Sequence, residues 1–89
     1  MNKTLENLRK EIDILDEELL NILAKRMDIV YKVGKLKKEQ GIPPLDKTRW
    51  QQIVDRIIET AKKKNIPETS VKIIYEEIHK AALSLEKNL

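Results

Sequence analysis

Two basic residues stand on a predicted helix face that is otherwise apolar. Arg26 and Lys37 lie eleven positions apart, close to three helical turns, so their side chains point to the same side. Their backbones are about 16 Å apart along the helix axis. Two long cationic side chains at that spacing can grip a small dianion, although each can also reach along the helix surface to water.

Arg26 carries the stronger signal because it interrupts a seam of apolar residues. A buried guanidinium without a partner is unfavourable, and no acidic residue lies on its stripe. Either a carboxylate from elsewhere in the assembly or an anionic ligand must therefore neutralise Arg26. The seam repeats at three- and four-residue intervals, as in a coiled coil, through Leu5, Leu8, Ile12, Leu15, Leu19, Ile22, Ile29, Val33 and Leu36.

Four further charged residues lie beside surfaces that we expect to be buried or at a helix start that faces them. Arg9 is next to the seam near its start, and Glu86 follows Ala82 by about one helical turn. Asp46 is a predicted helix cap, and Arg49 stands where a capping box would have Glu or Gln, so this cation opposes the helix dipole. Together these side chains predict an interior anion site in which guanidinium groups bind carboxylates.

Three helices separated by two proline-containing breaks must position these residues. Nothing interrupts a helix from Thr4, a suitable cap, to about residue 39, where the stretch GIPPLD ends it. We expect a second helix over residues 47–64 and, after the stretch NIPETS, a third over residues 68–87. The predicted fold is all-α, with one very long and two shorter helices in a single domain over residues 1–89.

The first helix is too long for a compact monomer. A helix of about 36 residues spans ~54 Å, whereas a compact chain of 89 residues has a diameter of roughly 30 Å. The protruding half would expose its apolar stripes unless a second chain covered them. We therefore expect an intertwined homodimer in which the long helices pack together.

Composition narrows the classes of function. The net charge is only +3 and the chain has two Tyr and one Trp, so we expect no nucleic-acid partner. The basic run at residues 62–64 and His79 are interpreted as solvated surface. No Cys and a single His argue against disulfides and a metal centre. No apolar run approaches a membrane span or a signal peptide, so we expect no membrane partner and a cytoplasmic location.

The stretch LRKEIDILDEELLNILAKRMDIVYKVGKLK, followed by GIPPLDKTR, resembles the all-helical class of chorismate mutases. The resemblance extends over essentially the whole chain. The long first helix of that class typically carries Arg, then Ile-Asp-x-(Leu/Ile)-Asp, then Arg, then Val-Gly-x-x-Lys. The matching residues here are Arg9, Ile12, Asp13, Leu15, Asp16, Arg26, Val33, Gly34 and Lys37.

The resemblance implies a homodimer with shared active sites that converts chorismate to prephenate in phenylalanine and tyrosine biosynthesis, without a cofactor. Catalysis would rest on conformer selection and on electrostatic stabilisation at the ether oxygen. Arg9 would come from the neighbouring chain and bind, with Arg26, the substrate carboxylates. Lys37 and a protonated Glu86 would face the ether oxygen.

The resemblance places the start of the second helix beside the C4 hydroxyl of chorismate. Asp46 would offer its backbone to that hydroxyl, and Arg49 would line the wall. Trp50 stands where the class usually has a Glu that accepts from the hydroxyl, and Ala82 stands where Ser is common. Trp50 also lies on the apolar stripe with Ile53, so core packing and a changed pocket are both open.

Three alternatives are compatible with the sequence. Isochorismate-pyruvate lyases resemble the same class and need not retain that Glu, and aminodeoxychorismate mutases, another relative of this fold, accept an amine at C4. A helical dimerisation module without enzymatic activity would instead pair Arg26 with acidic residues across the dimer. The matches at Glu86, Lys37 and the arginines favour chorismate as the substrate.

Overall fold

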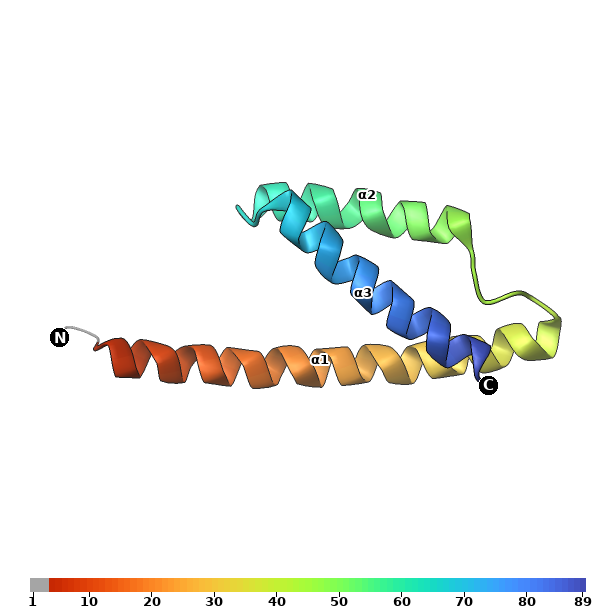
Figure 1. Cartoon of the computed structure of the whole chain (residues 1–89), viewed down its shortest axis with the longest axis horizontal. Coiled ribbons are helices and arrows are strands. Elements are labelled where there is room, and N and C mark those ends of the chain that lie inside the picture. The colour runs from red at the N-terminus through yellow and green to blue at the C-terminus, as the bar shows by residue number, and fades with distance from the viewer. Residues whose placement is uncertain (1–3) are drawn as a thin grey trace.

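Three α-helices make up the computed structural model, which describes residues 4–89 (Figure 1). They are α1 (Leu5–Gln40), α2 (Lys47–Lys63) and α3 (Glu68–Lys87). Each bound lies within one residue of the prediction, which confirms the all-α fold. None of these three helices is long and apolar enough to cross a membrane.

Local capping interactions explain where the helices begin and end. Thr4 Oγ1 accepts a hydrogen bond from the backbone N–H of Asn7 at 3.1 Å, which caps α1. At the other end Gly41 has φ +70°, and the N–H of Ile42 donates to the carbonyl oxygen of Lys37 at 2.8 Å. This left-handed turn ends α1 and directs the chain into the loop toward α2.

The helices form an open arrangement in which α3 contacts both of the others. In Figure 1, α3 runs obliquely from the end of α2 to the C-terminal part of α1, and the first turns of α1 extend past both partners. The chain measures 59 × 24 × 15 Å with a radius of gyration of 16.7 Å. A compact chain of this length would have a radius of gyration of about 12 Å, so the protrusion expected of the long helix is present.

The core of the single chain is small. Its buried apolar side chains are Ile53, Val54, Ile57 and Ala61 of α2 together with Ala82 of α3. The seam of α1 is largely exposed, with Leu15 at 60% and Leu19 at 56% of full exposure. In α1 only Gly34 is buried.

Gly34 marks the closest approach of α3 to α1. A Cβ atom at this position would lie 2.6 Å from Cδ1 of Leu89 and 3.0 Å from Cγ of Glu86. Leu89 could swing aside, but Glu86 is held beside the backbone of α1. The absent side chain therefore lets the end of α3 lie directly against α1, one turn before Lys37.

Replacing Gly34 by Val should destabilise the fold although valine has the higher helix propensity. The added methyl groups would force Glu86 away from α1, and such overpacking costs about 1 to 3 kcal/mol of the free energy of unfolding. Urea unfolding measures the change. Lys32→Val, at an exposed position of the same helix, should stay within about 0.5 kcal/mol of wild type. Equal effects of the two variants would contradict a tight contact at Gly34.

Candidate active site

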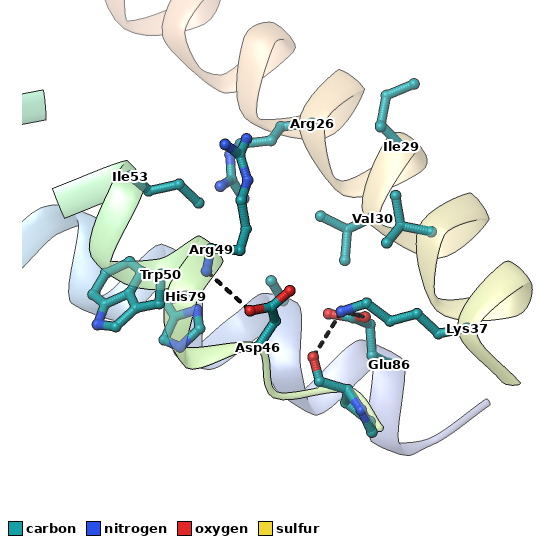
Figure 2. A pocket seen from close by; sticks show the side chains of 13 residues that line it. Arg26, Ile29, Val30, Lys37, Asp46, Arg49, Trp50, Ile53, His79 and Glu86 are labelled. Carbon is teal, nitrogen blue, oxygen red and sulfur yellow. Dashed lines mark hydrogen bonds and ion pairs between the residues drawn. The ribbon is translucent and has the colours of Figure 1, made fainter. Parts of the chain in front are cut away.

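A cavity of about 270 Å³ opens between α1, the loop after it, the start of α2 and the second half of α3 (Figure 2). Its size is near the lower end of the range of roughly 300 to 1,000 Å³ that is usual for small-molecule sites. Isoleucine and valine side chains line it together with charged groups. Of the site residues predicted from the sequence, it brings together Arg26, Lys37, Asp46, Arg49, Trp50, Ala82 and Glu86.

Arg26 contributes a partly buried guanidinium group to the cavity. Its atom Nη1 is buried and has no hydrogen-bond partner among residues 4–89. Figure 2 shows the Arg49 side chain rising from the start of α2 toward Arg26, so the two guanidinium groups point into the same end of the cavity. Two guanidinium groups that converge without a carboxylate between them form a site suited to an anion.

Lys37 and Glu86 form a largely buried ion pair between α1 and α3. Their side chains are 20% and 8% exposed, and Nζ lies 2.9 Å from Oε1 of Glu86. The ammonium donates its hydrogen bond to the carbonyl oxygen of Pro44 at 2.7 Å. Oε1 itself accepts no well-directed hydrogen bond from the described residues, so charge alone holds it there. An ammonium and a carboxyl group are thus both available to a ligand.

Asp46 has a structural task at the start of α2. Its Oδ1 accepts the backbone N–H of Arg49 at 2.9 Å, as the predicted cap requires. The cap fixes the first turn, in which Arg49 and Trp50 both reach the cavity wall. The basic residue Arg49 in this first turn is therefore explained by its position in the wall of a cavity that suits an anion.

Trp50 stacks on His79 at the opposite end of the cavity from the ion pair (Figure 2). The ring centroids are 4.0 Å apart and the rings are within 9° of parallel. Both rings line the cavity, and the interpretation of His79 as solvated surface is therefore wrong. A signal for it was present in the sequence, because His79 precedes Ala82 and Glu86 by three and seven residues and so shares their helix face.

The surroundings of His79 favour its neutral form. Burial lowers the pKa of the imidazole below its ordinary value of 6.5, and the positive charges of Arg26 and Lys37 lower it further. The carboxylate of Glu86 acts in the opposite direction and does not compensate. At neutral pH the ring therefore has one N–H donor and one acceptor nitrogen.

Arg9 is the predicted site residue that the single chain leaves outside the cavity. It is exposed on the protruding part of α1. Seventeen residues separate it from Arg26, which corresponds to about 25 Å along the helix. Its supply by a neighbouring chain stays a prediction. Within residues 4–89, no three His, Cys, Asp or Glu side chains gather where they could hold a metal ion.

Comparison with known proteins gives a consistent result. The family described as chorismate mutase type II matches residues 8–87. The chain is 35% identical over 68 residues to a chorismate mutase of Methanocaldococcus jannaschii, covering 76% of this chain and 69% of the relative. A solved chorismate mutase structure (Form II) from Thermus thermophilus superposes with a TM-score of 0.87 at 29% identity, over 96% of both chains.

A longer relative contains a similar segment. The bifunctional chorismate mutase/prephenate dehydratase of Aquifex aeolicus is 35% identical over 88 residues. The alignment covers 96% of this chain but only 24% of that enzyme. This chain thus spans about a quarter of the length of the bifunctional relative.

Acidification should destabilise the protein through His79. Because the pKa of the folded-state imidazole is below 6.5, the unfolded chain binds more protons, and stability is lost as the pH falls through and below that value. His79 is the only histidine, so His79→Gln should flatten the dependence between about pH 5.5 and 7.5. Urea unfolding at several pH values tests this; equal slopes for the two proteins would contradict the assignment.

Proposed function

This chain belongs to the chorismate mutase type II family, and from that membership we propose that it rearranges chorismate to prephenate, a step of phenylalanine and tyrosine biosynthesis. The observation that carries the proposal is the buried, unpartnered Nη1 of Arg26 inside a cavity of small-molecule size. Chorismate is a dicarboxylate, and a carboxylate is the natural partner of such a guanidinium.

The reaction needs neither a nucleophile nor a cofactor. In one pericyclic step the ether C–O bond breaks while a C–C bond forms, and atoms and charge balance within the substrate. The protein accelerates such a step by holding the reactive chair-like conformer and by stabilising the charge that grows on the departing oxygen. The stiff isoleucine and valine lining supports the first task, and the charged groups of the cavity support the second.

Lys37 and Glu86 are the proposed electrostatic groups at the ether oxygen. The ammonium is held at one end of the cavity by Pro44 and Glu86, so it is positioned before a ligand enters. A bound ether oxygen would accept from Lys37. Glu86 could donate to the same oxygen only in its protonated form, since a carboxylate would repel it.

We also propose that the active protein is a homodimer with shared sites. The exposed seam of α1 gives one reason, because Leu15 and Leu19 are more than half exposed. A second apolar cavity of about 500 Å³, lined mainly by α2 and α3 and also by Leu19 of α1, offers a surface for an apolar helix. Arg9 of the partner would then add a further guanidinium for the substrate's carboxylates. The absence of cysteine supports a reducing, cytoplasmic location.

Removing the Arg26 side chain should strongly reduce turnover while the dimer persists. Arg26→Ala should lower kcat/KM by roughly 100-fold, the value of a charge-assisted contact made in a water-poor site. Loss of the diene absorbance of chorismate measures turnover, and light scattering gives the oligomeric mass. The matched control Lys25→Ala removes a neighbouring exposed cation and should behave as wild type. A wild-type protein that dimerises but leaves chorismate and isochorismate unchanged would support a dimerisation module instead.

Shared sites make a separate prediction for mixed dimers. Arg9→Ala and Arg26→Ala homodimers should each be inactive, because every site lacks one arginine. After the two are unfolded and refolded together, half of the dimers are mixed and each has one intact site, so about a quarter of wild-type activity should return. No recovery, although mass spectrometry detects mixed dimers, would contradict the supply of Arg9 in trans.

A further inference from the structure

We propose that His79, held by its stack on Trp50, is a specificity-determining residue that hydrogen-bonds the secondary hydroxyl group of the substrate. This inference rests on the proposed function, because it names the group that reads one part of chorismate. His79 lies in α3, outside the sequence motifs of α1 on which the resemblance rests.

Each polar group of the substrate can be matched to the part of the cavity whose charge suits it. The carboxylates suit the guanidinium end formed by Arg26 and Arg49, and the ether oxygen suits the end formed by Lys37 and Glu86. One hydroxyl group is left, and a buried hydroxyl needs both an acceptor for its proton and a donor for its oxygen. The aromatic end of the cavity is the part of the wall not yet assigned.

His79 is the lining side chain best suited to that hydroxyl. Arginine, lysine and the indole N–H of Trp50 only donate, while an ionised Glu86 only accepts. The Asp46 side chain also only accepts, and its Oδ1 is already used by the backbone N–H of Arg49, while the backbone N–H of Asp46 itself can only donate. A neutral imidazole offers a donor and an acceptor on opposite sides of one ring, so it can serve a hydroxyl group whichever way the proton points.

The stack on Trp50 fixes the position of the His79 ring, as recognition of one hydroxyl group requires. A ring centroid distance of 4.0 Å and an angle of 9° restrict the imidazole to one plane against the indole. Trp50 lies one helical turn after Asp46, and Figure 2 shows the Asp46 side chain between the two rings and the Lys37–Glu86 pair. A hydroxyl near the first turn of α2 would therefore meet the edge of the His79 ring.

The charged groups that face His79 keep it in the form that this role needs. Arg26 and Lys37 of α1 oppose a further positive charge, and Glu86 of α3 favours one but does not prevail. Asp46 and Arg49 at the start of α2 line the same cavity. The imidazole thus keeps its acceptor nitrogen at neutral pH.

The test compares His79→Phe with wild type on two substrates. Phenylalanine keeps a flat ring for the stack but has no nitrogen, so kcat/KM for chorismate should fall roughly 10-fold, chiefly through KM, as expected for one lost hydrogen bond. For the chorismate analogue with hydrogen in place of the C4 hydroxyl, the variant should equal wild type. His79→Gln, which keeps a donor and an acceptor, should recover part of the loss on chorismate.

Tyr75→Phe is the matched control, because it removes one polar atom from an α3 ring that lines the apolar cavity instead. It should leave both substrates unaffected. Equal losses on chorismate and on the deoxy analogue would show that His79 only packs, and would overturn the inference while leaving the proposed function intact. Wild-type protein that turns over neither substrate would overturn both, and turnover of 4-amino-4-deoxychorismate in preference to chorismate would overturn the assignment of a hydroxyl partner.

Discussion

The close contact of α3 with α1 at Gly34 determines the geometry of the cavity. Because no side chain separates the two helices there, Glu86 lies against α1 and reaches Lys37 at 2.9 Å. His79 and Ala82 share a helix face with Glu86. The orientation of α3 that places Glu86 against α1 therefore also turns them toward the cavity. A wider spacing would break the ion pair and separate the apolar wall from the cations of α1.

The cavity is stabilised less well than a core of the same size would be. An unpartnered buried donor such as Nη1 of Arg26 destabilises a fold by about 1 to 3 kcal/mol, a large fraction of the stability of a small domain. The ion pair between Lys37 and Glu86 has also lost much of its hydration. The unpartnered donor is unfavourable without a ligand and becomes favourable when an anion supplies the missing acceptor. This difference is the usual mark of a site organised for binding.

Local signals made the helices predictable, and tertiary contacts limited what else could be predicted. The prolines of the two breaks, the Asp46 cap and Gly41 define the helix ends through interactions within a few residues, which the sequence contains in full. The burial of Arg26 followed from its position in an apolar seam. The stack of Trp50 on His79 did not, because it joins α2 to α3 and depends on how the two helices rotate about each other. Each residue alone fitted an ordinary position, and only their contact in the fold suggests the proposed role.

Two independent features indicate that the single chain needs a second copy. The core draws its buried apolar side chains from α2 and α3, so the apolar seam of α1 stays largely exposed within residues 4–89. Arg9, which is also proposed to bind the substrate carboxylates, lies outside the cavity and about 25 Å from Arg26 along the same rigid helix. A helix too long for its own fold can bring Arg9 only to another copy of the chain. The apolar surface and the missing cation therefore both support the proposed homodimer, in which the contact that covers the seam would also complete the site.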